Sequence, residues 1–257
     1  IVAVLLLSGY FGKAQESRTE LVNQVFGKYT KEEGVHNAFF RIESADKDLE
    51  EDLVFGAFSD GNEATLKTPF YTASIGKTFT AVAIAKLVEE KRLNFDDRVM
   101  DRLGDLVSGL HVIGGKDYSS TLTIHHLLSH TSGLPDYFED EPKSGVNMIQ
   151  KLFMEPSRMW QPQELLSFTK SNFSAHFKPG EGYHYTDTGY VLLGLVVQQI
   201  TGMKLDQYFE AEIFKPLSLN RTNMNLRSES VETSDVDMAE IYVGPMEISQ
   251  FKSLSAD

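Results

Sequence analysis

Ser74 and Lys77 stand three residues apart at the start of a strongly apolar stretch. Residues i and i+3 lie side by side on one face of a helix, so the Lys77 amine can reach the Ser74 hydroxyl. An amine in a desolvated pocket loses its proton more readily and can then accept the proton of a nucleophilic serine. A helix start also supplies backbone N–H groups and the positive end of the helix dipole, which stabilise negative charge at the serine.

The same spacing occurs where a serine only caps a helix and the lysine is solvated. The context favours chemistry, because a helix with little polar face is expected to be buried, and a lysine in its first turn then needs a reason to be there. The apolar residues of this stretch are Ile75, Phe79, Val82, Ala83, Ile84, Leu87 and Val88.

Two further segments agree with this interpretation. Residues 127–134 read Leu-Leu-Ser-His-Thr-Ser-Gly-Leu, and residues 185–187 read Tyr-Thr-Asp after a Phe-Lys-Pro-Gly turn at 177–180. In this order and spacing the chain resembles the serine β-lactamase and penicillin-binding superfamily, in its class C β-lactamase-like serine hydrolase branch. That branch includes D-alanyl-D-alanine carboxypeptidase, D-aminopeptidase and esterase relatives. The resemblance covers roughly residues 35–219.

The resemblance implies a serine hydrolase that acts by acyl-enzyme transfer on an amide or ester: a β-lactam, a D-amino-acid peptide or a small ester. It implies that Ser74 is the nucleophile, that Lys77 and Tyr185 share proton transfer, and that Asp187 binds substrate. Which of Lys77 and Tyr185 is the base stays open. The Ser74 N–H would form half of an oxyanion hole. The implied partner is a small-molecule or peptide substrate, and neither a metal nor a cofactor is implied.

Asp187 departs from the family pattern, which usually has Asn at this position. An Asn can donate a hydrogen bond to a substrate amide, whereas an ionised Asp only accepts. A carboxylate near Lys77 also favours the ammonium form and makes the lysine a poorer base. We therefore expect inefficient β-lactam hydrolysis. The alternative function is a non-catalytic penicillin-binding-like protein that binds cell-wall peptide or β-lactam without turnover, although Ser74, Lys77 and Tyr185 together favour an enzyme.

Two other patterns point to different functions but are weaker, and one further motif is absent. Residues 76–78 (Gly-Lys-Thr) look like the end of a phosphate-binding loop, but that loop requires a glycine where this chain has Tyr71. His126 and His130 have a spacing that could bind zinc, but a metalloprotease helix has Glu where this chain has Leu127, and a structural role is favoured. A Gly-x-Ser-x-Gly motif is absent, which argues against an α/β-hydrolase.

Composition limits the partners. The chain has 257 residues and a net charge of −13, which argues against nucleic acid and anionic membranes. It contains no cysteine, so disulfides and thiolate metal ligands are excluded. The oligomeric state is left open.

The first residues predict export. Residues 1–7 form an apolar run too short to span a bilayer, and residues 12–14 (Gly-Lys-Ala) have the small-residue spacing of a signal cleavage site. We interpret residues 1–14 as the remnant of a signal peptide, so the mature protein would be secreted or periplasmic, without stable membrane insertion. A buried N-terminal strand is the alternative.

We expect an α+β, β-lactamase/DD-peptidase-like fold in residues 15–257, with an antiparallel sheet flanked by helices plus an all-helical lobe at about 95–201. Thr123 is expected to cap a short helix. The other predicted elements are helices at 18–29, 74–91, 163–170, 190–200 and 205–214, and a hairpin of strands 35–43 and 53–58. The family takes further strands and a third site motif from a C-terminal segment that this sequence lacks. We therefore expect residues 1–257 alone to be an incomplete domain without activity.

Overall fold

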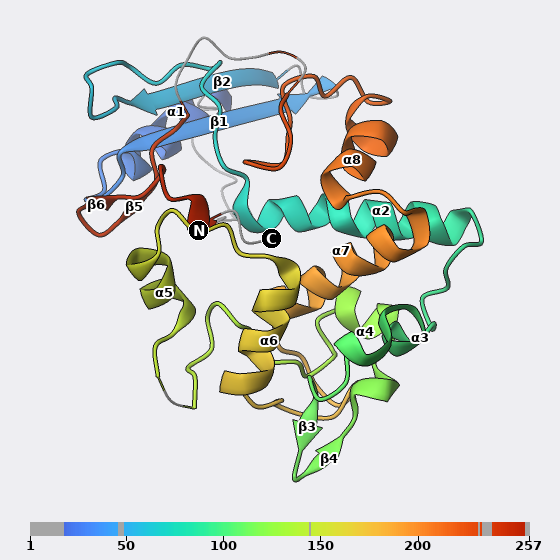
Figure 1. Cartoon of the computed structure of the whole chain (residues 1–257). Helices are drawn as coiled ribbons and strands as arrows, with labels where there is room; N and C mark the ends of the chain where they lie inside the picture. Colours follow the sequence, from blue (N-terminus) through green and yellow to red (C-terminus); the bar gives the residue numbers. More distant parts are fainter. Residues whose placement is uncertain (1–17, 46–48, 144, 231, 233–237, 255–257) are drawn as a thin grey trace, which may run out of the picture. The chain divides into compact units, whose positions relative to one another are not determined.

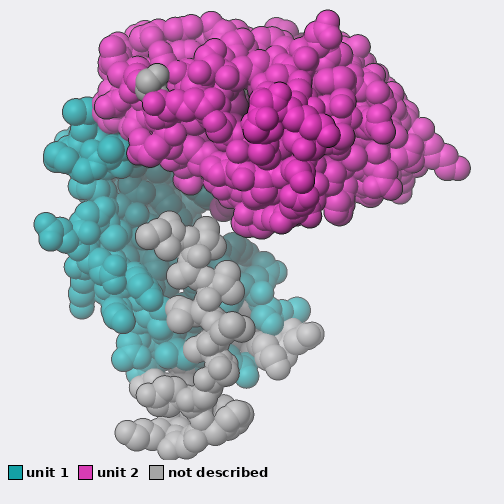
Figure 2. Space-filling model, turned by 90° about the horizontal axis from the view of Figure 1, so that it is seen from below, with its two compact units in different colours: residues 1–71, 234–249 teal, residues 72–233, 250–257 magenta. Residues whose placement is uncertain are grey.

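The structure is a computed structural model of the whole chain, and it describes residues 18–45, 49–143, 145–230, 232 and 238–254. The chain divides into two units, formed by residues 1–71 with 234–249 and by residues 72–233 with 250–257 (Figure 2). The predicted signal remnant at residues 1–14 lies outside the described residues. The predicted bounds of the hydrolase domain and its helical lobe stay predictions.

The first unit is built on the predicted hairpin. Strand β1 (Asn37–Ser44) pairs antiparallel with β2 (Leu49–Gly56), and the register runs from Asn37 opposite Gly56 to Ser44 opposite Leu49. β2 therefore begins four residues before the predicted strand at 53, because the pairing extends to the end of β1. Helix α1 (Arg18–Tyr29) is confirmed and contacts the hairpin, with the rings of Phe26 and Phe40 6.3 Å apart. A two-stranded sheet of β5 (Tyr242–Val243) and β6 (Met246–Glu247) belongs to the same unit.

The second unit is built around helix α7 (Asp187–Thr201), which Figure 1 shows beside α2 (Lys77–Glu89) and α6 (Pro162–Asn172). Every residue from Val191 to Val197 in α7 is buried, as the apolar run predicted. The helix ends where Gly202 adopts the left-handed conformation (φ 74°), which glycine permits at low cost. α7 contacts α2 and α6 and also the shorter helices α3 (Val99–Leu103), α4 (Ile124–Leu128) and α8 (Leu205–Phe209), so one helix organises this core.

Shorter elements complete the unit. They are η2 (Ala73–Gly76), α3 (Val99–Leu103), η3 (Gly104–Leu106), β3 (Val112–Ile113), β4 (Lys116–Asp117), η4 (Ser119–Thr121), α4 (Ile124–Leu128), α5 (Met148–Met154), α8 (Leu205–Phe209), the π-helical turn η5 (Glu210–Phe214) and η6 (Lys252–Leu254). Thr123 caps α4 as predicted, because its hydroxyl accepts the His126 N–H at 3.2 Å. Among the helices of the described residues, none is long and apolar enough to cross a membrane.

The prediction for α2 is correct in one part and wrong in another. Ala83, Ile84 and Leu87 are buried as expected, because they lie on one stripe at helical spacing. Val82 is 40% exposed and Ile75 is 56% exposed, contrary to the prediction of a helix buried all round. Val82 lies off the buried stripe, and Ile75 belongs to the preceding turn η2.

Gly133 allows two loops to approach closely. Its φ is +71°, and a Cβ at this position would lie 2.0 Å from the Phe177 carbonyl oxygen. The Gly133 carbonyl accepts the His176 N–H at 2.9 Å, and His111 Nε2 lies 2.8 Å from the same Phe177 oxygen. Glycine is therefore required for loop 130–134 to pack against the segment that leads to α7.

Replacement of Gly133 by alanine should destabilise the protein far more than the same change at Gly109. Both glycines have positive φ (+71° and +77°), but a Cβ at Gly109 would meet nothing within 4 Å. Gly109→Ala should therefore cost only the strain of a left-handed alanine, about 1–2 kcal/mol. Gly133→Ala should cost ~2 kcal/mol or more in addition, because backbone must move. Urea denaturation measures both, and equal losses would show that the loop contact contributes nothing.

Candidate active site

Ser74 lies in the turn η2, immediately before α2, and is exposed to solvent. Ser74 was predicted to begin the helix, but it lies one turn before the first residue of α2. Ala73 has φ 45°, a left-handed conformation that costs on the order of 1–3 kcal/mol for a residue with a Cβ. This turn places the Ser74 hydroxyl 2.7 Å from Tyr185 OH and 3.4 Å from Lys77 Nζ. An accessible hydroxyl with two such neighbours has the arrangement of an activated nucleophile.

Lys77 is the first residue of α2 and is largely withdrawn from water. Its ammonium forms an ion pair with Asp187, and the two side chains are only 15% and 12% exposed. Its Nζ also lies 5.3 Å from the ring centroid of Tyr185 and 5.8 Å from that of Tyr190. The charge is thus held between one carboxylate and two aromatic faces, all of which attract a cation.

Tyr185 reaches Ser74 from the segment before α7. Its ring stacks on His130, with centroids 4.5 Å apart and planes at 29°. Its hydroxyl donates a hydrogen bond to Ser74 Oγ. A tyrosine that is fixed by stacking and bonded to the serine oxygen is well placed to exchange a proton with it.

His130 supports this arrangement, and sequence reasoning gave it only an unspecified structural role. Its Nδ1 accepts the Thr186 N–H at 3.2 Å, and its carbonyl accepts the His184 N–H at 2.9 Å. Burial lowers the pKa of His130, and the positive charge of Lys77 lowers this pKa further. A neutral imidazole can accept the Thr186 N–H, so His130 holds both ends of the Tyr185 backbone.

The start of α7 is anchored on the loop that follows His130. The hydroxyls of Thr186 and Thr188 donate to the Pro135 carbonyl at 2.9 and 2.8 Å. Asp136 is 1% exposed and accepts backbone hydrogen bonds, including one from Asp187. Burial raises the pKa of Asp136 to about 7, and the charge of Asp187 adds to this rise. The sequence offered no signal for this support, because it depends on contacts between distant segments.

The four residues predicted from the sequence, Ser74, Lys77, Tyr185 and Asp187, are thus brought together around one hydroxyl. His126 supports the start of its own helix, because its Nδ1 accepts the Thr123 N–H.

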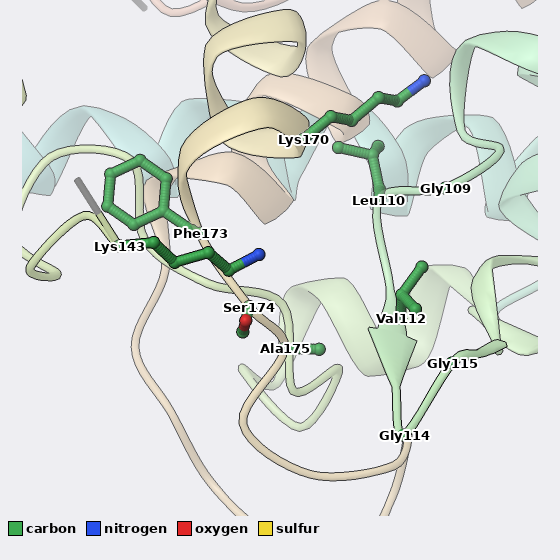
Figure 3. A pocket seen from close by; sticks show the side chains of 10 residues that line it. All are labelled: Gly109, Leu110, Val112, Gly114, Gly115, Lys143, Lys170, Phe173, Ser174 and Ala175. Atoms are coloured by element: carbon green, nitrogen blue, oxygen red, sulfur yellow. The ribbon is translucent and has the colours of Figure 1, made fainter. Parts of the chain in front are cut away.

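A separate pocket lies elsewhere in the same unit, and none of the four predicted residues lines it. Its volume is about 270 Å³, and Figure 3 shows the β3–β4 hairpin together with residues 173–175 along its wall. Lys143 and Lys170 contribute amines to the lining, so the pocket is cationic.

Known proteins resemble the chain over most of its length. It is 33% identical to Penicillin-binding protein 4* of Bacillus subtilis over 190 residues, which cover 70% of this chain but 36% of that protein. A structure of the octameric penicillin-binding protein homologue from Pyrococcus abyssi matches with a TM-score of 0.67 and 27% identity, covering 88% of this chain and 48% of that one. A D-stereospecific amidohydrolase from Streptomyces sp. matches with a TM-score of 0.60 and 28% identity, covering 72% and 51%.

These structural matches confirm the predicted β-lactamase/DD-peptidase-like fold. The chain spans about a third of the curated relative and about half of each matched structure. The family model described as Beta-lactamase matches residues 39–236, a range that includes all four predicted site residues. The chain therefore belongs to the beta-lactamase family, within the serine β-lactamase and penicillin-binding superfamily.

Proposed function

We propose that the protein is a serine hydrolase that cleaves an amide or ester through an acyl-enzyme on Ser74. The observation that carries this proposal is the Ser74 hydroxyl, which is exposed and lies 2.7 Å from Tyr185 OH and 3.4 Å from Lys77 Nζ. In acylation, Ser74 Oγ attacks the substrate carbonyl carbon, its proton passes to the site base, and the amine or alcohol leaves with a proton. Water then repeats the attack on the ester and releases Ser74.

Tyr185 is the proposed proton acceptor. The ion pair with Asp187 stabilises the ammonium form of Lys77, which has no lone pair with which to accept a proton. The Tyr185 hydroxyl also lies closer to Ser74 Oγ than Lys77 Nζ does, at 2.7 Å against 3.4 Å. Tyr185 would first release its phenol proton to water, and its hydrogen bond with Ser74 would then reverse direction. The phenolate would take the serine proton during the attack and pass it to the leaving amine or alcohol.

The proposed substrates are D-amino-acid amides and peptides or small esters, in a class C or DD-peptidase type of mechanism. The similarity to a D-stereospecific amidohydrolase and to Penicillin-binding protein 4* supports this class. The predicted signal remnant and the penicillin-binding relative support a secreted or periplasmic location.

The alternative is binding of cell-wall peptide or β-lactam without turnover. The buried Lys77–Asp187 ion pair favours this alternative. A Lys77 held as an ammonium cannot accept a proton, and this loss would slow deacylation as well as acylation. Turnover and binding are separated by measuring product release after the first acylation.

A substrate panel tests the proposal, using the product of the complete open reading frame that encodes this chain. The panel consists of D-phenylalanine amide, a p-nitrophenyl ester and nitrocefin, a chromogenic β-lactam. Ser74→Ala should abolish multiple turnover of every substrate that the natural protein cleaves. Ser167→Ala, which changes an exposed serine on α6, should leave all rates unchanged. A Ser74→Ala variant with natural rates would refute the nucleophile, and a single acylation without turnover would favour the binding protein.

Tyr185→Phe should lower kcat/KM for the ester by about 100- to 10,000-fold, the range of general-base catalysis. The fold should survive, because phenylalanine keeps the ring that stacks on His130. Tyr183→Phe is the matched control, since Tyr183 is 69% exposed and lies two residues before Tyr185 on the same segment. Rates within twofold of the natural enzyme in the Tyr185 variant would exclude Tyr185 as the base.

Asp187→Asn should raise nitrocefin cleavage relative to ester cleavage by about 10-fold. One additional hydrogen bond to the β-lactam amide would contribute ~1.4 kcal/mol. The change also frees Lys77 from its carboxylate, so the lysine can share proton transfer. Asp105→Asn removes one exposed negative charge and serves as the control. The ratio of the two kcat/KM values measures the effect, and an unchanged or lower ratio contradicts it.

A further inference from the structure

Asp140, His176 and His184 bring three potential metal ligands together outside the catalytic candidates. One ligand atom from each residue lies within 4.8 Å of the others. His176 Nε2 is 2.7 Å from Asp140 Oδ2, and His184 Nε2 is 3.1 Å from Asp140 Oδ1. The two imidazole rings face each other with centroids 3.8 Å apart. Two ring nitrogens therefore converge on one carboxylate.

We propose that these three side chains bind one divalent first-row transition metal ion, with zinc as the representative. Two imidazole nitrogens and one carboxylate oxygen form a donor set that zinc commonly uses with a water as fourth ligand. Zinc ligands at about 2.0–2.1 Å in a tetrahedron lie roughly 3.3 Å from one another. Measured to the one oxygen Asp140 Oδ2, the separations of 2.7 Å for His176 Nε2 and 3.2 Å for His184 Nε2 need only a small expansion to admit the ion.

The backbone already holds each ligand in place. The Asp136 N–H donates to Asp140 Oδ2 at 2.8 Å, which orients the carboxylate. The His176 N–H donates to the Gly133 carbonyl and the His184 N–H to the His130 carbonyl, both at 2.9 Å. Little ordering remains to be done when the ion binds, and this favours affinity.

The site is open to solvent on one side. The side chains of His176 and His184 are 39% and 26% exposed, while that of Asp140 is 17% exposed. An ion can thus enter from water, and a coordination position remains for a water molecule. The chain has no cysteine, so thiolates do not compete for the metal.

The consequence is a link between the two loops that carry the candidate active site. Asp140 follows the loop of His130, while His184 immediately precedes Tyr185. A bound ion would fix the backbone of Tyr185 relative to this loop without touching Ser74. Its role is structural, and it is independent of whether the protein is a hydrolase.

Calorimetric titration of the untagged, chelator-treated protein with Zn²⁺ tests the site. One ion per chain should bind, and Zn²⁺ at about 100 times the Kd should raise the Tm by ~5–10 °C. His176→Ala should weaken binding by at least ~10-fold, as even changes beyond the direct ligands do. His125→Ala, an exposed histidine on α4, should bind Zn²⁺ as the natural protein does.

Co²⁺ as a second probe identifies the ligands. The natural protein should give the intense visible bands of a tetrahedral site, and His184→Gln should lose them. Asp140→Asn keeps the side-chain shape, so it should stay folded and should still weaken metal binding. It therefore separates the loss of a ligand from unfolding of the variant. Absence of Zn²⁺ binding by the natural protein, or unchanged affinity in both His176→Ala and Asp140→Asn, would overturn the proposal.

Discussion

The ion pair between Lys77 and Asp187 is the contact on which the candidate site depends. Lys77 is the first residue of α2 and Asp187 the first of α7, so the pair joins the starts of the two principal helices. A cation at a helix N-terminus is unfavourable in the helix dipole, and the carboxylate at the neighbouring helix start offsets this cost. Removal of either partner would leave a charge in a site that is about 85% withdrawn from water.

The apolar core below the ion pair makes this geometry rigid. α7 is buried almost along its whole length, while its polar start receives support from Thr186, Thr188 and the Pro135 carbonyl. His130 adds a stacked ring and two backbone hydrogen bonds on the other side of Tyr185. Ser74 is consequently surrounded by groups that need little reorganisation, which is what an enzyme requires of its reacting groups.

Sequence reasoning succeeded where short-range spacing along the chain determines position. Ser74 and Lys77 lie a turn apart, and the run before Gly202 predicted the buried helix α7. The site motif around Tyr185 was placed by family resemblance rather than by physics. Sequence reasoning failed for the stacking of His130 on Tyr185 and for the Asp140–His176–His184 cluster, because loops bring these residues together. It also failed for Val82, since an apolar residue does not reveal which side of a helix is covered.

Mass spectrometry of the quenched reaction tests the central claim, that Ser74 carries the acyl group, most directly. The product of the complete open reading frame would be mixed with a D-amino-acid ester or a penicillin, stopped in acid, digested and sequenced. The account predicts an acyl adduct on Ser74, with Lys77 unmodified in the same digest. An adduct on another residue, or steady product release without any adduct on Ser74, would contradict it.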